Sequence, residues 1–264
     1  MTSALKIGVG GALGRMGSAV TAMVRARDGV VLAGRFDRPD APQDPVETVP
    51  LATREVVLKT CDVVVDFSTG PATAALAAAA AARGGVALVV AATGLTAEEQ
   101  VAVARASKLI AIVQSGNYSV GVNVLAGLVE QASRRLGPDV WDIEIVEAHH
   151  RRKVDAPSGT AGLLAQAAAR GRGRNSQDII ARPRDGITGP RSAGEIGMAS
   201  LRGGGIVGDH SVVFAAEEEI ITLSHSARDR ALFARGALEA AVWVAGRPPG
   251  LYDMVDVLGF RDGA

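Results

Sequence analysis

Short aliphatic runs alternate with segments of helical periodicity through the first 118 residues. Five of these runs are bounded by turn-forming residues and read as strands: Leu5–Gly10, Val30–Phe36, Asp62–Phe67, Val86–Ala92 and Leu109–Gln114. Helices are predicted between them, over Met16–Arg27, Ala72–Arg83 and Ala97–Ser107. Apolar strands that alternate with helices are typical of a parallel sheet buried on both faces. We therefore predict the α/β class, with a Rossmann-type doubly wound parallel sheet.

The pattern changes after Asn117. Helices are expected over Val120–Leu136, Pro157–Arg170 and Asp229–Val244. Before the second helix, Ile143, Ile145 and Glu147 alternate with Glu144, Val146 and Ala148, as in a strand with one buried face. Three more strands are expected at Ile196–Arg202, Ile206–Ala216 and Glu218–Ala227. Their alternation and short connections predict antiparallel pairing, so we expect a second α+β domain with a mixed or antiparallel sheet.

Composition narrows the class of protein. The 264 residues carry 28 basic and 28 acidic side chains, which gives no overall attraction to nucleic acid or to an anionic membrane. An arginine- and glycine-rich run at 170–197 is therefore read as a solvated loop rather than a nucleic-acid patch. One cysteine, Cys61, excludes an internal disulfide and suits a reducing compartment. No signal peptide or membrane span is recognised, so a cytoplasmic location is expected.

The first strand leads into GVGGALGRMG, whose glycines Gly11, Gly14 and Gly17 precede a predicted helix. Glycine is needed where the backbone turns tightly and approaches a pyrophosphate at a helix N-terminus. Asp37 ends the second strand at the distance expected of a ribose-hydroxyl acceptor. The alternative is a tight structural turn, but the flanking strand and helix favour dinucleotide binding.

The choice between NADH and NADPH stays open at this level. Asp37 would repel a ribose phosphate, whereas the adjacent Arg38 could bind it. Two later turns, Ala91–Gly94 and Ser115–Tyr118, follow strands and lie where such a sheet holds the nicotinamide end. Ordinary strand-to-helix turns are the competing interpretation of both.

A cluster of proton donors follows the strand that ends near Ala148. His149, His150 and Lys153 come just before the predicted helix start at 157–160, where free N–H groups bind anions. An imidazole beside such an anion pocket can donate or accept a proton near neutral pH. A zinc site would need a cysteine or carboxylate constellation, and a Ser158–Lys153 nucleophile pair would need an oxyanion hole. Neither is evident, and a capped helix with solvated charges is the remaining alternative.

Several motifs together resemble one family in order and spacing: GALGRMG, VDFSTGPAT, SGNYSVGVNVL, IEIVEAHHRRKVDAPSGTA, RDGITGPR and GGIVGDHSVVFA. They resemble dihydrodipicolinate reductase, the NAD(P)H-dependent enzyme of lysine and diaminopimelate biosynthesis. The resemblance implies a dinucleotide-binding domain at 1–118, to which 229–264 returns. It also implies a domain at 119–228 that binds a small dicarboxylate and builds a homotetramer.

The resemblance also implies residue roles. His149 and Lys153 would manage the proton, and the carboxylates would be bound by His150, Lys153, Ser158, Gly159 and Thr160. No metal is implied. NADH or NADPH would be bound by Gly11, Ala12, Leu13, Gly14, Arg15, Met16, Asp37, Arg38, Ala91, Ala92, Thr93, Ser115, Gly116, Asn117 and Tyr118.

The chain departs from the family pattern at several places, among them Arg152, where histidine is frequent, and a shorter segment between Arg38 and Asp62. Ala91-Ala92-Thr93-Gly94 stands where the family usually has G-T-T-G, and Tyr118 replaces the commoner phenylalanine or methionine, adding a hydroxyl near the nicotinamide. Two other functions remain as alternatives. Another dehydrogenase, acting on an amino acid or semialdehyde, would not need the full His-His-Lys cluster, and a non-catalytic NAD(P)H sensor could dispense with His149 and Lys153.

Overall fold

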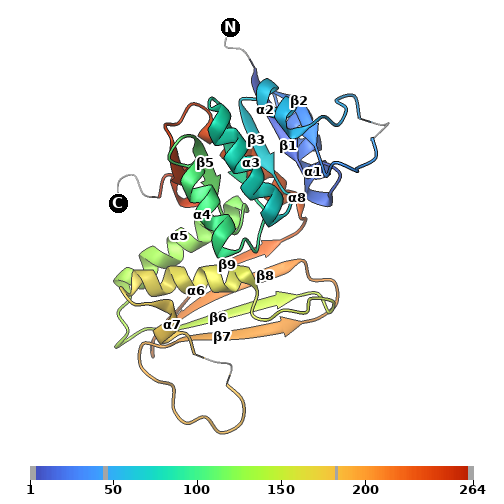
Figure 1. Cartoon of the computed structure of the whole chain (residues 1–264). Helices are drawn as coiled ribbons and strands as arrows, with labels where there is room; N and C mark the ends of the chain where they lie inside the picture. The colour runs from blue at the N-terminus through green and yellow to red at the C-terminus, as the bar shows by residue number, and fades with distance from the viewer. Residues whose placement is uncertain (1–3, 44–46, 182–183, 261–264) are drawn as a thin grey trace. The chain divides into compact units, whose positions relative to one another are not determined.

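The structure is a computed structural model that describes residues 4–43, 47–181 and 184–260 (Figure 1). The chain forms two compact units. The first contains residues 1–120 and 231–264, and the second contains residues 121–230. Within the described residues, no helix is long and apolar enough to cross a membrane.

A six-stranded sheet with every neighbouring pair parallel organises the first unit, in the order β10-β5-β4-β3-β1-β2. Its strands are β1 (Leu5–Gly10), β2 (Val30–Phe36), β3 (Val63–Asp66), β4 (Ala87–Val90), β5 (Ala111–Gln114) and β10 (Gly250–Tyr252). The predicted doubly wound sheet is confirmed. Because β1 lies between β2 and β3, the chain changes direction across the sheet there. Such a switch point is where open α/β sheets bind ligands.

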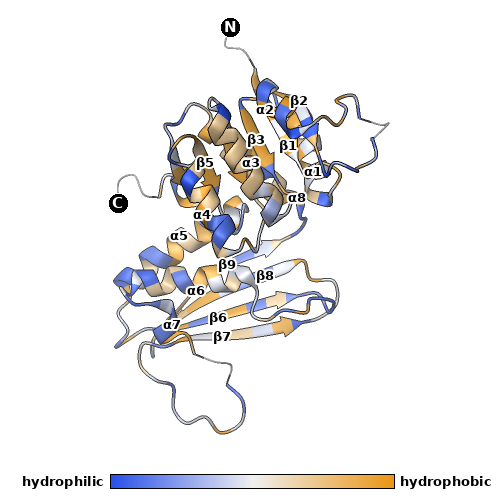
Figure 2. Ribbon diagram, viewed as in Figure 1, coloured by the Kyte–Doolittle hydropathy of each residue, from blue (hydrophilic) through white to orange (hydrophobic). Residues whose placement is uncertain are grey.

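Alternate side chains of these strands pack against helices on opposite faces. One face, with Ile7 and Val65, packs against α1 (Arg15–Arg25) and α8 (Ala231–Val244). The other, with Val64 and Leu88, packs against α2 (Arg54–Thr60), α3 (Gly70–Arg83) and α4 (Ala97–Ala106). β3 is buried along its whole length, and most of it is orange in Figure 2. A capping box of Thr96 and Glu99 is present at the start of α4.

The second unit contains a four-stranded sheet in the order β7-β6-β8-β9. Its strands are β6 (Asp142–His149), β7 (Ile196–Arg202), β8 (Gly208–Ala215) and β9 (Ile220–Ala227). The expectation of antiparallel pairing holds for β8 with β9 and for β6 with β8. It is wrong for β7, which pairs in parallel with β6. The long segment between β6 and β7 includes a helix, which is the connection that parallel neighbours require.

Helices cover one face of this sheet. Ile143, Ile145 and Phe214 are buried against α5 (Val120–Arg135) and α6 (Gly159–Gly171), with the short α7 (Ser176–Ile179) beside them. Pro157 was expected in the first turn of α6, but that helix begins at Gly159 with Ser158 as its N-cap. The Ser158 hydroxyl accepts a hydrogen bond from Ala161 N, because a free N–H at a helix start needs an acceptor.

Candidate functional site

The glycine turn after β1 depends on the absence of side chains. Gly11 has φ +66°, and a Cβ on it would lie 2.8 Å from the carbonyl oxygen of Phe67. A Cβ on Gly17 would lie 2.1 Å from the Gly11 carbonyl oxygen, far inside van der Waals contact. The turn can therefore pack against α1 only with glycine at these positions. Helix α1 starts directly afterwards with no acidic residue in its first turn, so its N–H groups suit an anion.

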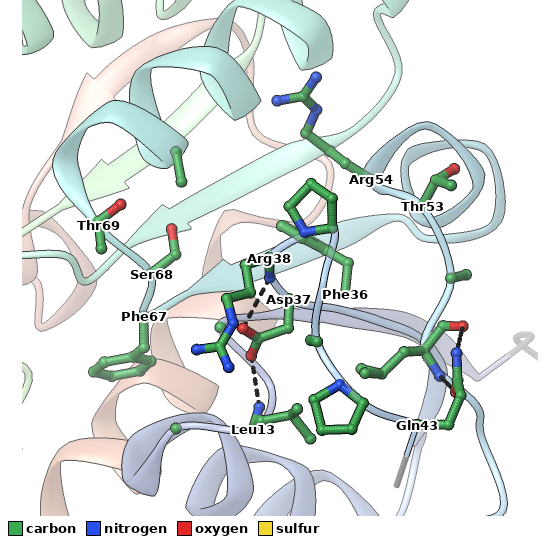
Figure 3. Close-up of a pocket in the computed structure, with 18 of the residues that line it drawn as sticks. Leu13, Phe36, Asp37, Arg38, Gln43, Thr53, Arg54, Phe67, Ser68 and Thr69 are labelled. Atoms are coloured by element: carbon green, nitrogen blue, oxygen red, sulfur yellow. Dashed lines mark hydrogen bonds between the residues drawn. The ribbon is translucent and has the colours of Figure 1, made fainter.

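A cavity of about 1090 Å³ opens beside this turn, at the carboxyl ends of β1, β2 and β3 (Figure 3). Of the predicted cofactor residues, it is lined by Gly11, Leu13, Gly14, Asp37 and Arg38. The sequence interpretation missed other lining residues, including Phe67, Ser68 and Thr69 after β3 and Gln43, Thr53 and Arg54 beyond β2. The signal for the first three was their place directly after a buried strand at the same sheet edge.

Asp37 lies at the centre of this cavity wall. Its Oδ2 accepts a hydrogen bond from Leu13 N and its Oδ1 accepts one from Arg38 N, both at 2.8 Å. Each carboxylate oxygen keeps a further lone pair, so Asp37 can still accept from a sugar hydroxyl. The Arg38 guanidinium pairs with Asp40 at 3.2 Å, and both side chains are exposed. Such a surface pair is weak, which leaves Arg38 able to move toward a phosphate.

Asp66, the last residue of β3, fixes the loop that lines this end of the cavity. It is fully buried, accepts a hydrogen bond from Thr73 Oγ1 at 2.6 Å and accepts another from Ser68 N at 3.1 Å. Burial raises the pKa of this carboxyl, and the hydrogen bonds from Ser68 and Thr73 oppose that effect. Asp66 therefore joins the loop that carries Ser68 to the first turns of α3.

The remaining predicted cofactor residues of this unit do not line the cavity. Ala12 is buried, and Arg15 and Met16 form the start of α1. Ala91, Ala92 and Thr93 follow β4, and Ser115, Gly116, Asn117 and Tyr118 follow β5. The second group is ordered locally, since Asn117 N donates to Ser115 Oγ at 3.3 Å. Both turns lie at the carboxyl edge of the parallel sheet.

The Tyr118 hydroxyl, expected near the nicotinamide, is buried between two strand ends. Tyr118 is buried, and its hydroxyl lies 2.8 Å from the Val90 carbonyl oxygen and 3.0 Å from that of Val113. Burial raises the pKa of this phenol, so it stays a hydrogen-bond donor. The hydroxyl therefore joins the ends of β4 and β5 rather than adding a free group beside a nicotinamide.

Substituting Tyr118 by phenylalanine should lower the free energy of unfolding by about 1–3 kcal/mol, because buried carbonyl groups lose a donor. Urea unfolding measures this loss. Tyr252→Phe is the matched control, since its hydroxyl also donates to a carbonyl, that of Pro248, but is exposed to solvent. Equal losses in the two variants would contradict a special role for the Tyr118 bond.

In the second unit, the predicted proton donors gather where β6 ends and α6 begins. His149 is the last residue of β6, and its side chain is 13% exposed. Its Nδ1 lies 2.6 Å from Glu147 Oε2. Glu147 is 1% exposed and was not singled out by the sequence interpretation. The signal for it was a carboxylate at a buried position of the alternation that begins with Ile143 and Ile145.

Glu147 is surrounded by hydrogen-bond donors, of which His149 Nδ1 is one. Arg202 Nη1 and Nη2 donate to Oε2 and Oε1 at 2.9 and 2.8 Å, and Ser158 N donates to Oε1 at 3.2 Å. Burial by itself would raise the pKa of Glu147, but the hydrogen bonds from Arg202 and His149 outweigh it and lower the pKa to about 2. Glu147 is therefore ionised at neutral pH.

His210 on β8 is the second imidazole of this cluster. Its ring centroid lies 5.2 Å from that of His149, and its Nε2 lies 2.9 Å from Ser158 Oγ. Burial and the neighbouring His149 lower the pKa of His210 to about 4, so its ring is neutral at pH 7. Because the His210 ring is neutral, the positive charge of this cluster comes from side chains such as Arg202 and Lys153.

Lys153 and His150 complete the predicted site. The Lys153 ammonium donates to both carboxylate oxygens of Asp155 at 2.8 Å, which lowers the pKa of that carboxyl. His150 Nε2 lies 3.4 Å from an Arg230 guanidinium nitrogen. Gly159 has open space where a Cβ would be, so a ligand can approach its backbone. Thr160 follows it in the first turn of α6.

This arrangement can bind an anion and move a proton. The positive end of the α6 dipole and the Lys153 ammonium supply positive charge, and His149 supplies an imidazole with a carboxylate partner. Across the described ranges, no group of three or more His, Cys, Asp or Glu side chains could hold a metal ion. The site therefore has the parts for acid–base chemistry on a carboxylate substrate.

Comparison with known proteins decides the family. The family model described as "Dihydrodipicolinate reductase, N-terminus" matches residues 5–118, and the one described as "Dihydrodipicolinate reductase, C-terminus" matches residues 121–258. The chain belongs to the dihydrodipicolinate reductase family. A relative from Caulobacter vibrioides named 4-hydroxy-tetrahydrodipicolinate reductase is 54% identical over 262 residues, covering 99% of this chain and 100% of the relative.

A second relative and a solved structure of the dihydrodipicolinate reductase family are also similar to this chain. A Rhizobium rhizogenes protein with the same name is 48% identical, over 97% of each chain. Among solved structures, "Dipicolinate bound Dihydrodipicolinate reductase from Paenisporosarcina sp. TG-14" aligns with a TM-score of 0.79 at 23% identity, over 96% of this chain and 98% of that one. The likeness to that structure shows a shared fold.

Proposed function

We propose that this chain reduces 4-hydroxy-tetrahydrodipicolinate to tetrahydrodipicolinate with NADH or NADPH, in lysine and diaminopimelate biosynthesis. Family membership supports this reaction, and so does the name shared by the relatives from Caulobacter and Rhizobium. The single observation that carries the chemistry is the His149–Glu147 pair beside the start of α6, where an acid–base group adjoins an anion-binding helix end.

The proposed cofactor site fits the cavity of the first unit. The glycine turn lets a pyrophosphate approach the N-terminus of α1, and Asp37 or Arg38 would contact the ribose. NADH or NADPH, when bound, supplies the hydride. We propose that Ala91–Thr93 and Ser115–Tyr118 contact its nicotinamide half, because both turns follow the carboxyl ends of neighbouring parallel strands.

In the second unit, the dicarboxylate would be bound by His150, Lys153 and the backbone of Ser158–Thr160. One carboxylate suits the positive end of the α6 dipole, and the other suits the Lys153 ammonium once it leaves Asp155. His149 and Lys153 would then supply the proton that must follow a hydride. Because the proposed substrate carries a 4-hydroxyl group, its conversion to tetrahydrodipicolinate also releases one molecule of water.

An absorbance assay tests the function. The substrate is generated in situ from pyruvate and aspartate semialdehyde by the preceding synthase, and NADH and NADPH are oxidised in parallel reactions. Rapid oxidation that depends on the synthase is expected with at least one cofactor. The ratio of the two rates reports whether Asp37 or Arg38 dominates. Cofactor binding without oxidation would contradict the proposed reaction.

We further propose that residues 1–118 with 229–264 bind the dinucleotide and that residues 119–228 bind the substrate and build a homotetramer in the cytoplasm. The sheet face opposite α5 and α6 supports self-association. It carries Leu201 at 57% exposure and Ile220 at 66% exposure, together with Val146 and Val213. Exposed apolar side chains on one sheet face suit contact with a second copy of the chain.

Light scattering after size exclusion tests this assembly. The wild type is expected at four times the chain mass of 27.0 kDa. Leu201→Asp should shift the protein to smaller species, because a buried unpaired charge destabilises an interface. Leu109→Asp is the matched control, since Leu109 is 63% exposed on the first unit. A monomeric wild type would contradict the proposal.

A further inference from the structure

We infer that Glu147 and Arg202 act as positioning residues for His149: together they fix which ring nitrogen carries its resting hydrogen and how readily the ring gains a second proton. This inference rests on the proposed role of His149 in proton transfer. It concerns two side chains outside the predicted site residues, one from β6 and one from β7.

The contact geometry fixes the tautomer. An ionised carboxylate only accepts hydrogen bonds, so the 2.6 Å contact between Glu147 Oε2 and His149 Nδ1 places a hydrogen on Nδ1. The nitrogen that gains or loses a proton is then Nε2, since the bond made by one ring nitrogen sets the state of the other. Gly208 on β8 leaves this nitrogen uncovered, because a Cβ there would lie 3.1 Å from it.

Arg202 holds the carboxylate in place and moderates its charge. Its two guanidinium nitrogens donate to the two oxygens of Glu147, and one also donates to the Asp155 carbonyl oxygen at 2.7 Å. The fork fixes the plane of the carboxylate, so the His149 ring has one favoured orientation. Its positive charge also offsets part of the attraction of Glu147 for a protonated His149. The two residues therefore act in opposite directions on the same proton.

Other charged or titratable groups face this cluster from each neighbouring strand. On β8, His210 lies beside His149, and on β9, His225 pairs with His210. Burial lowers the pKa of His225, and burial together with His149 lowers that of His210. Asp209, next to His210 in sequence, forms a short hydrogen bond with Ser226. From the start of α6, Ser158 N donates to Glu147, and Ser158 Oγ contacts His210 Nε2. Within the described residues, Glu147 is the carboxylate that contacts His149 directly.

Substitutions of opposite charge test the inference. In Glu147→Gln, His149 loses its carboxylate, and its proton is expected to dissociate roughly one pH unit or more lower than in the wild type. In Arg202→Gln, a competing positive charge is removed, and the shift is expected toward higher pH. Arg202→Lys keeps the positive charge, so His149 in this variant should titrate at a pH close to that of the wild type. A loss of packing would not produce shifts of opposite sign.

Glu144→Gln is the matched control. Glu144 lies on the same strand but on the opposite face, and like Glu147 it is bound by arginine, here Arg184 and Arg191. Its substitution removes the same charge and should leave His149 unchanged.

The readout is the pH titration of histidine rings labelled with 13C and 15N. The chain has four histidines, and each can be assigned by a His→Gln variant. The wild-type neutral ring of His149 should show the Nδ1–H tautomer. An unchanged His149 titration in Glu147→Gln, or shifts of the same sign in Glu147→Gln and Arg202→Gln, would overturn the inference.

Kinetics separates this inference from the proposed function. The kcat of Glu147→Gln is expected to fall on the order of a hundredfold, with the alkaline limb of its pH profile moved to lower pH. Cofactor affinity should be unchanged. If the ring titrations shift as expected but kcat does not fall, the positioning role stands and the role of His149 in proton transfer is wrong.

Discussion

Replacing Lys153 by alanine should lower kcat on the order of a hundredfold or more, as removal of a positioned acid does. Lys153 is the one lysine in the loop between β6 and α6, and its ammonium donates to Asp155 in the same loop. Without it, the substrate carboxylate and the proton both lose a partner. Steady-state oxidation of NADH or NADPH measures the loss.

Arg152→Ala is the control for this result. Arg152 is the adjacent residue, carries the same charge and is exposed, so its loss should change kcat little. Cofactor affinity should stay unchanged in both variants, because the residues of the proposed dinucleotide site belong to the other unit. If Lys153→Ala turned over at the rate of Arg152→Ala, the proposed role of Lys153 would be wrong.

Replacing Gly17 by alanine should weaken dinucleotide binding on the order of a hundredfold, equivalent to about 3 kcal/mol. The new Cβ would lie 2.1 Å from the Gly11 carbonyl oxygen and 2.7 Å from the Ala12 Cα, both backbone atoms that cannot rotate away. The glycine turn or α1 must therefore shift, and the pyrophosphate site shifts with it. Fluorescence titration with NADH measures the affinity.

The same substitution should also lower the free energy of unfolding, by about 1–3 kcal/mol, as overpacking does. Gly162→Ala is the matched control, since Gly162 lies inside α6 and a Cβ there has open space. It should bind NADH normally and should be slightly stabilised, because alanine favours a helix. Normal NADH affinity in Gly17→Ala would contradict the proposed cofactor site.

Local patterns decided most of the sheet in the first unit. Strands such as β1 and β3 are mainly aliphatic and flanked by turn residues, so periodicity identified them before any contact was known. The sequence pattern did not predict the shorter elements β10 and α2. β10 has three residues and joins the sheet beside β5, where its pairing rather than its sequence defines it. α2 has seven residues and was not expected, although Thr53 caps it.

In the candidate site, too, local motifs were predicted from the sequence, whereas contacts between distant residues were not. Motif spacing predicted the glycine turn, Asp37 and the His149–Lys153 segment, because each belongs to a short local pattern at the end of a strand. Arg202 is 55 residues from Glu147, and His210 is 52 residues from Ser158. Such pairs meet only because β6 lies between β7 and β8. The sequence by itself therefore determined the family and most strands of the parallel sheet, and it predicted the candidate reactive groups. Only the tertiary structure decided which buried charges hold those groups in place, since strand order and register set contacts across the sheet.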